Sequence, residues 1–210
     1  MKNRILPVVL ILLFHISSCT NADDKLEIYL TNGIIESFEG IPLKEAVGDS
    51  IKYKEIVDLY GEKLKYDTIN QKILYYGRFT IEENDLKDKP FIIDSEILGV
   101  DFKKSEIIFT NSVSKKIYQE LKNVDHSMVR GRQFVLMHNN NPVINGYLFS
   151  TYSSYWSNTY QIHFNHSEKI DQKEVRFSFT GSINFDEYHL IKNKKLVKAF
   201  EKRNERIIGM

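Results

Sequence analysis

The stretch that decides the fold is EIIFTNSVSKKIYQELK, residues 106–122, where an apolar run passes directly into a helical pattern. Residues 106–110 are rich in β-branched and aromatic side chains, which is typical of a strand. Asn111 can cap a following helix, because its side chain can accept hydrogen bonds from free backbone N–H groups. Three apolar residues one helical turn apart predict the buried face of a helix over residues 112–122: Val113, Ile117 and Leu121.

Strand patterns extend from this segment in both directions. The expected strands are residues 91–93 before it and residues 133–138, 142–150, 158–164 and 174–180 after it. Asn139-Asn140-Asn141 separates two of these strands and suits the positive backbone angles of a tight hairpin. Residues 186–203 predict a helix. The order predicts an α+β fold with a mixed or antiparallel sheet, a β-α-β-β core and a C-terminal helix.

Residues 26–90 predict a smaller α+β subdomain that precedes the one at residues 91–210. Residues 26–31 alternate between apolar and polar side chains and lead into the turn signal Asn32-Gly33. Thr80 and Glu83 form a capping box, which predicts a helix of one to two turns that ends before Pro90. The other expected elements are strands at residues 34–38, 66–69 and 72–79 and a short helix at residues 51–60.

The N-terminus has the parts of an export signal over residues 1–18. They are a positive region with Lys2 and Arg4, an apolar region at residues 5–14, and the small residues Ser17 and Ser18. The apolar run is shorter than the roughly 20 residues that span a bilayer. Cys19 is the only cysteine, and its position resembles the lipobox of bacterial lipoproteins. An ordinary secretory signal with a cysteine at the cleavage point is the alternative.

The lipobox resemblance implies cleavage before Cys19 and the attachment of two or three acyl chains to this residue. Two or more chains hold a protein durably on a membrane. Residues 19–25 would then be the lipidated cysteine and a flexible polar tether. In similar lipoproteins, an aspartate directly after the lipidated cysteine favours retention at the inner membrane. This chain has Thr20 at that position, so the resemblance favours the outer membrane. The acidic tether also resembles export signals of surface-exposed Bacteroidota lipoproteins, so the expected location is the cell envelope, on either face.

The overall charge gives no reason to expect a nucleic-acid partner. Loss of Lys2 and Arg4 leaves 27 of the 29 basic residues against 28 acidic residues, a net charge of −1. Aromatic residues make up 12% of the chain, which favours a packed, β-rich core over disorder.

Residues 91–164 resemble the periplasmic head domain of SecD, the auxiliary membrane subunit of the Sec protein-export machinery. The resemblance rests on IIFT (107–110) followed by SKKIY (114–118), GRQFVLM (131–137) followed by PVIN (142–145), and NTYQI (158–162). It implies a head-type fold and contact with extended polypeptide or envelope partners. The family's Asp-Gly-Lys hairpin is replaced by Asn139-Asn140-Asn141, and the transmembrane helices of the family are missing. Translocase activity is therefore not implied. The alternative is that the two domains have the same β-α-β-β order without being related.

Candidates for catalysis and metal binding are few, and no cofactor is expected. His163 and His166 are three residues apart, but on a strand that ends in a loop their rings point to opposite faces. Three carboxylates lie together at the N-terminus of the expected short helix: Glu82, Glu83 and Asp85. The helix dipole favours carboxylates at this position, so the cluster alone does not indicate catalysis. A hydrolase built from scattered carboxylates is the remaining catalytic alternative.

The best binding candidate is the aromatic and hydroxyl-rich segment at residues 147–160. Its candidate contacts for a sugar or a peptide are Tyr152, Tyr155, Trp156 and Tyr160. Core packing of these rings, with a serine-rich connecting loop, is the alternative. The basic C-terminal helix could contact anionic lipid headgroups, although a solvated helix face explains its charges equally well. The basic residues of this helix and of the tail that follows it are Lys192, Lys194, Lys195, Lys198, Lys202, Arg203 and Arg206.

Two functions of different class follow from these patterns. The first is a non-enzymatic envelope lipoprotein, held to the membrane by its lipid, that binds a protein or peptide partner. An immunity-type lipoprotein that blocks a toxin is a variant of it. The second is a lipid-anchored enzyme that acts on envelope material. The patterns favour the first, because no recognisable catalytic motif accompanies the anchor.

Overall fold

The computed structural model describes residues 24–42, 65–67, 69, 72–123, 131–151, 153, 157, 159–164, 174–179, 188–203 and 206–209. The strands are β1 (Leu26–Leu30), β2 (Phe38–Pro42), β3 (Lys65–Asp67), β4 (Lys72–Tyr76), β5 (Ile97–Asp101), β6 (Glu106–Thr110), β7 (Arg132–His138), β8 (Asn141–Ser150), β9 (Tyr160–Phe164), β10 (Glu174–Ser178) and β11 (Arg206–Ile208). The helices are α4 (Ser112–Asn123) and α6 (Lys194–Lys202), with short 3-10 helices at Glu83–Asp85, Asp94–Glu96 and Leu190–Lys192.

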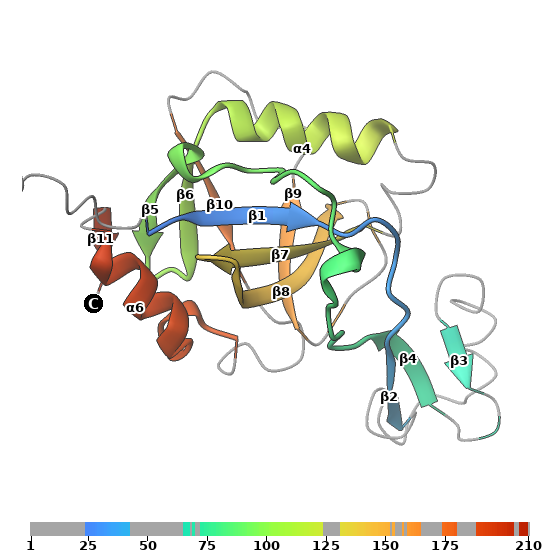
Figure 1. The fold of residues 1–210 in the computed structure, drawn as a ribbon. Helices are drawn as coiled ribbons and strands as arrows, with labels where there is room; N and C mark the ends of the chain where they lie inside the picture. Colours follow the sequence, from blue (N-terminus) through green and yellow to red (C-terminus); the bar gives the residue numbers. More distant parts are fainter. Residues whose placement is uncertain are drawn as a thin grey trace, which may run out of the picture.

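The fold is α+β, as predicted, with two mixed four-stranded sheets and a C-terminal helix (Figure 1). The first sheet has the order β1-β7-β8-β9, in which only the β8–β9 pair is parallel. The second has the order β10-β6-β5-β11, in which only the β5–β11 pair is parallel. A third sheet, β2-β4-β3, lies at the periphery of the molecule (Figure 1).

The two large sheets and the described helices α4 and α6 share one hydrophobic core. Alternation along β1 turns Leu26, Ile28 and Leu30 into this core, and each is at most 2% exposed. The predicted face of α4, with Val113, Ile117 and Leu121, is also buried in it. From α6, the core receives Leu196, Ala199 and Phe200. The amphipathic patterns of the sequence are thus confirmed.

The predicted β-α-β-β order is present, but its strands are divided between the two sheets. The strand before α4, β6, belongs to the second sheet, whereas β7 and β8 belong to the first. β1, from the segment 26–90, pairs with β7 along its full length. Residues 26–90 therefore supply an edge strand to the sheet that residues 132–164 build.

Several local expectations differ from the structure. Residues 91–93 form only an isolated bridge between Ile92 and Ile28, and the strand that pairs with β6 is β5 at Ile97–Asp101. The second strand begins at Phe38 instead of residue 34. Residues 83–85 form a 3-10 helix, and residues 190–202 are divided into a 3-10 helix and α6 at Asn193, whose side chain caps α6. The helix expected at residues 51–60 lies outside the described residues.

Candidate functional site

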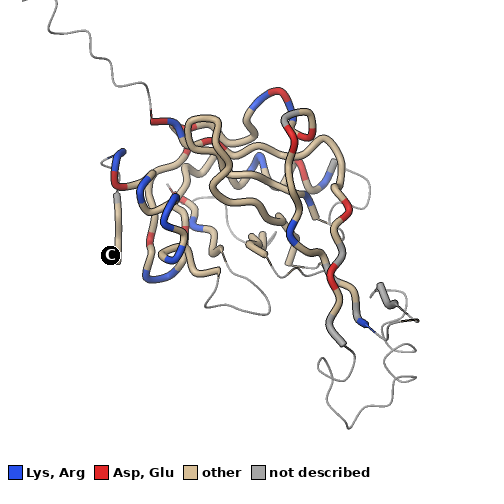
Figure 2. Tube along the Cα trace, turned by 60° about the horizontal axis from the view of Figure 1, so that its bottom comes forward, with Lys and Arg blue, Asp and Glu red and all other residues tan. Residues whose placement is uncertain are grey.

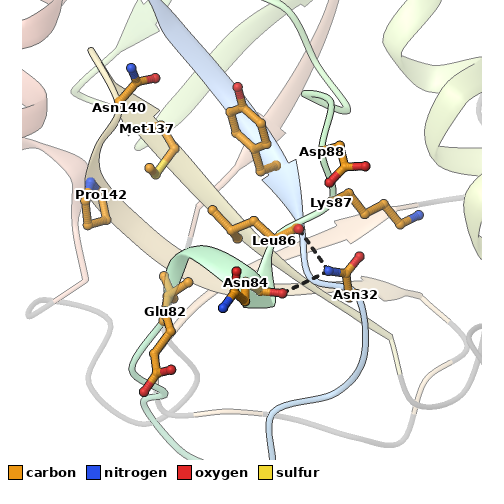
Figure 3. Close-up of a pocket in the computed structure, with 11 residues that line it drawn as sticks. Asn32, Glu82, Asn84, Leu86, Lys87, Asp88, Met137, Asn140 and Pro142 are labelled. Carbon is orange, nitrogen blue, oxygen red and sulfur yellow. Dashed lines mark hydrogen bonds between the residues drawn. The ribbon is translucent and has the colours of Figure 1, made fainter.

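The candidate site is a cavity on the outer face of the first sheet, away from the shared core. Its volume is about 760 Å³, within the range of about 300–1,000 Å³ that is common for small-ligand sites. It lies between the strands β1, β7 and β8 and the segment 81–88 that crosses them (Figure 3). We call this cavity the outer groove.

Strand alternation determines the floor of the outer groove. Ile28 and Leu30 of β1 point into the core, so the side chain of Tyr29 between them points outward. The register pairs Tyr29 with Val135, which places Met137 two residues along β7 on the same face. Both Tyr29 and Met137 line the cavity. The floor therefore combines a phenol with a flexible thioether.

Hydrogen bonds to the end of β1 hold the wall of the outer groove in place. The Asn32 N–H donates to the carbonyl of Asp85 at 2.8 Å, and the Lys87 N–H donates to the carbonyl of Leu30 at 2.9 Å. The Asn32 side-chain amide donates to the carbonyls of Asn84 and Leu86 at 3.1 and 2.9 Å (Figure 3). The wall of the outer groove is thus held by hydrogen bonds within the chain, so a ligand need not order it.

The lining of the outer groove combines apolar and hydrogen-bonding groups. The apolar contributions come from Ile81, Leu86, Met137 and Pro142. Asn84 and Asn140 are exposed and add two side-chain amides at the rim. A ligand in this groove would therefore meet both kinds of surface at once.

The phenol of Tyr29 is held in its neutral form. Its hydroxyl donates to Glu27 Oε2 at 3.1 Å. Burial, and then the neighbouring Glu27 carboxylate, raise the pKa of Tyr29 above its ordinary value of 10.0. Tyr29 is therefore a hydrogen-bonding group, not an anion, at physiological pH.

Charges at the outer groove are mainly acidic. Glu82 and Asp88 are exposed at its rim. Lys87 also lines it, but its ammonium group lies 3.1 Å from the Glu120 carboxylate of α4. The rim therefore presents two carboxylates and one lysine that already has an ion-pair partner.

A second surface lies on the other side of the β7–β8 hairpin. Here a cavity of about 400 Å³ separates the hairpin from one face of α6. Its polar lining consists of His138, Asn139, Asn141, Lys195, Lys198 and Lys202. Figure 2 shows basic residues gathered along α6. We call Lys195, Lys198 and Lys202, together with the adjacent Lys194, the lysine face.

Asp24, the first described residue, is fixed at this second surface. Its Oδ1 accepts from Asn139 Nδ2 at 2.8 Å, and its carbonyl accepts from Arg203 Nη1 at 2.8 Å. Lys25 and Asn139 also exchange two hydrogen bonds, at 2.8 and 3.0 Å. The hydrogen bond from Asn139, and the charges of Lys202 and His138, lower the pKa of Asp24 despite the opposing effect of desolvation.

A third, smaller cavity contains the one described member of the predicted aromatic site. Tyr160 lies in this cavity of about 320 Å³ and packs edge-on against Tyr188, with ring centroids 5.2 Å apart. Arg78 donates from Nε and Nη2 to the Tyr188 hydroxyl at 3.0 and 2.7 Å. Tyr152, Tyr155 and Trp156 lie outside the described residues. The binding role of these four residues stays a prediction.

The other candidates from the sequence do not converge on one site in the described part of the chain. His138 lies at the hairpin, whereas His163 lies on β9 with its ring 5.7 Å from that of Phe149. Across the described ranges, no group of three or more His, Cys, Asp and Glu residues could hold a metal ion. None of the described helices is long and apolar enough to cross a membrane.

The outer groove itself was missed by sequence reasoning. Its lining comes from β1, the segment 81–88 and the β7–β8 hairpin, which are far apart in the chain. A scan against protein-family models and searches of curated proteins and of solved structures found no match for this chain. The function proposed below therefore rests on the chain's own residues.

Proposed function

We propose that this chain is a lipid-anchored protein of the bacterial cell envelope, placed at the outer membrane, that binds a peptide segment of a partner protein in the outer groove. The anchor is the expected acylation of Cys19. Binding, instead of catalysis, is the activity that the described lining supports.

The observation that carries this proposal is the combination of an apolar floor with amide groups at the rim. An extended peptide offers both kinds of partner, because its side chains alternate with main-chain N–H and C=O groups. Met137 and Leu86 provide apolar contact, and a flexible thioether adapts to different side-chain shapes. The amides of Asn84 and Asn140 can both donate to and accept from a peptide main chain.

The charge of the rim favours a peptide with a lysine or an arginine. Glu82 and Asp88 are exposed, and Lys87 is held at Glu120. Exposed charges interact weakly and are screened by salt. We therefore expect the affinity for a basic peptide to fall as the ionic strength rises, with the apolar contact retained.

The lining also favours a binding module over a hydrolase. The raised pKa of Tyr29 keeps its hydroxyl protonated, so it serves as a hydrogen-bonding group and not as a base at neutral pH. Asn32 is engaged with the backbone of the wall. The groups that converge in the groove are thus suited to holding a ligand.

Site-specific photocrosslinking in the native envelope tests the proposal. A benzophenone amino acid at Asn84 of the full-length, acylated protein should yield one main adduct, and the same probe at the exposed Lys115 of α4 should not. Mass spectrometry of the adduct identifies the peptide. A synthetic copy should bind the full-length protein in detergent, and Leu86→Glu should weaken binding about ten-fold, because it places a charge in the apolar contact.

Two results would count against a peptide-binding groove. Equal crosslinking at Asn84 and Lys115 would mean that no partner occupies the groove. Turnover of envelope material that is lost in groove variants, without any adduct, would favour the enzyme alternative.

A further inference from the structure

We propose that the lysine face of α6 rests on an anionic phospholipid surface when Cys19 is acylated, so that the anchor and α6 together set the orientation of the protein on the membrane. This inference rests on the lipid anchor of the proposed function. It adds a second membrane contact, and a defined orientation, to that anchor.

Only a short length of chain separates the acylated residue from the folded protein. Asp24 follows Cys19 by only five positions in the sequence. A fully extended chain spans at most about 3.6 Å per residue, so the two Cα atoms can be at most about 18 Å apart. Asp24 must therefore stay this close to the lipid-bearing residue.

Asp24 is attached both to the C-terminal end of α6 and to the hairpin. Its carboxylate accepts a hydrogen bond from Asn139 at 2.8 Å, and its carbonyl accepts one from Arg203 at 2.8 Å. Lys202 Nζ lies 3.9 Å from the same carboxylate. Arg203 follows α6 directly and also pairs with Asp94, whose carboxylate accepts from the Leu26 N–H at 2.7 Å. The short tether therefore brings α6 itself to the membrane.

The surface that the tether brings to the membrane is rich in lysine. At about 100° per residue, the four lysines occupy a stripe roughly 100° wide around α6: Lys194, Lys195, Lys198 and Lys202. All four are exposed. Among the described residues, Lys195 and Lys198 have no ion-pair partner within 4.0 Å, whereas Lys202 lies 3.9 Å from the Asp24 carboxylate. Glu201 borders the stripe, and the buried side of the helix carries Leu196 and Phe200.

Phospholipid headgroups fit this surface better than a protein partner does. Lysine is a flexible point charge that suits a fluid layer of phosphates, with no fixed geometry to match. A basic cluster next to a lipid anchor adds the second signal that stabilises membrane attachment.

The orientation has a consequence for the outer groove. Pro142 lines both the groove and the cavity beside the lysine face. The groove therefore opens next to the membrane-facing side of the hairpin, where it would meet a partner that is itself held at the membrane surface.

The test measures which side of the acylated, full-length protein faces lipid. A fluorophore is attached at Asn141→Cys, beside the lysine face, or at Gln119→Cys on α4 as the matched control. Both residues are exposed. The protein is reconstituted in vesicles of phosphatidylcholine with about 30% phosphatidylglycerol, which supply an anionic surface. Nitroxide-headgroup lipids then quench a fluorophore that lies near the surface.

We expect quenching at position 141 to be several-fold greater than at position 119. Combined Lys195→Gln, Lys198→Gln and Lys202→Gln substitutions should reduce the difference, since each lysine contributes roughly a five-fold preference for the anionic surface. Vesicles of phosphatidylcholine alone, which lack the anionic lipid, should also reduce the difference in quenching between positions 141 and 119. Circular dichroism confirms that the triple variant is folded.

Two results would overturn the orientation. Equal quenching at both positions, or quenching that is insensitive to the lysines and to phosphatidylglycerol, would mean that the anchor acts without α6. Mass spectrometry of the purified protein shows whether Cys19 is acylated, and so distinguishes a wrong orientation from a missing anchor. Acyl chains on Cys19 with equal quenching would overturn the orientation alone, whereas an unmodified Cys19 would overturn the anchor together with it.

Discussion

The two faces of the first sheet are built from the same strands but differ in chemistry. The inner face presents aliphatic and aromatic side chains to a core shared with the second sheet, α4 and α6. The outer face packs Val135, Tyr147 and Phe149 against Tyr76 and Phe79 in a separate, smaller cluster. Ile81, Leu86 and Met137 pack against this cluster and also line the outer groove.

Polar groups distinguish the outer face further. Buried Gln133 donates from Nε2 to the Ile35 carbonyl at 2.9 Å and to the Tyr147 hydroxyl at 3.1 Å. Its Oε1 accepts from the Ile35 N–H at 2.7 Å. The inner face is therefore stabilised mainly by burial, which is non-directional, and the outer face by burial combined with specific hydrogen bonds. The inner face is thus suited to stabilising the fold, and the outer face, with its directional hydrogen bonds, is suited to recognition.

The largest effect is expected from truncation on the inner face. Phe134 is 1% exposed and packs edge-on against Phe179, with ring centroids 5.9 Å apart. Phe134→Ala should lower the free energy of unfolding by about 3–5 kcal/mol, because it leaves a cavity in a close-packed core. Met137→Ala, on the half-buried groove floor, should cost only about 1 kcal/mol. Urea denaturation of both variants measures the difference, and similar losses would contradict the contrast between the faces.

The next effect concerns the hydrogen bonds of the outer face. Gln133→Leu nearly conserves volume but leaves the Ile35 backbone groups and the Tyr147 hydroxyl without this partner. We expect a loss of about 1–3 kcal/mol in the free energy of unfolding. Tyr147→Phe removes the hydroxyl that accepts from Gln133 and donates to the Gly77 carbonyl at 3.1 Å, and it should cost about 1 kcal/mol. Non-additive losses in the double variant, measured by the same denaturation, would confirm that the two residues act together.

A smaller, pH-dependent effect is expected at the margin of the inner core. Glu96 lies against α4, where burial opposes its charge but Lys116 at 2.6 Å, the Ile93 N–H and Ser112 stabilise it. The net result is that the pKa of Glu96 lies below the ordinary value of 4.5.

A lowered folded-state pKa stabilises the fold above the unfolded-state pKa, and this stability is lost as the pH falls through the folded-state value. The unfolding midpoint of Glu96→Gln should therefore depend less on pH below about 4.5 than that of the wild type. Denaturation at a series of pH values measures both profiles, and parallel profiles would contradict this role.

Local patterns predicted most of the secondary structure. The strand at Glu106–Thr110 and helix α4 follow from side chains that are close in the sequence. The hairpin prediction was also correct, because Asn139 and Asn140 have φ angles of 51° and 61°. The sequence did not predict β5, because the pairing register shifts between Ile97 and Gly99 and interrupts the strand pattern. It did not predict β11, because a parallel edge strand of three residues is too short to show a pattern.

The candidate sites could be predicted only in part. The lysines of α6 are visible in the sequence, but their position beside Asp24 depends on contacts between residues up to 179 apart. The outer groove depends on the register of β1 with β7 and on the path of residues 81–88, and neither is set by local propensity.

The two adjacent asparagines of the hairpin allow the smallest and most selective comparison. Asn140 lines the outer groove, whereas Asn139 bonds to Asp24 and Lys25 beside the lysine face. Both asparagines have positive φ angles, which glycine adopts without strain. Asn140→Gly and Asn139→Gly should therefore each change the free energy of unfolding by less than about 1 kcal/mol.

The functional readouts of these two variants should separate the surfaces. Asn140→Gly should reduce crosslinking from the groove and leave the orientation on vesicles unchanged. Asn139→Gly should do the reverse, and it should raise the pKa of Asp24, because the hydrogen bond from Asn139 is the main cause of its lowering. Loss of both readouts in either variant would mean that the hairpin acts as one structural unit, and that the two surfaces cannot be separated at this turn.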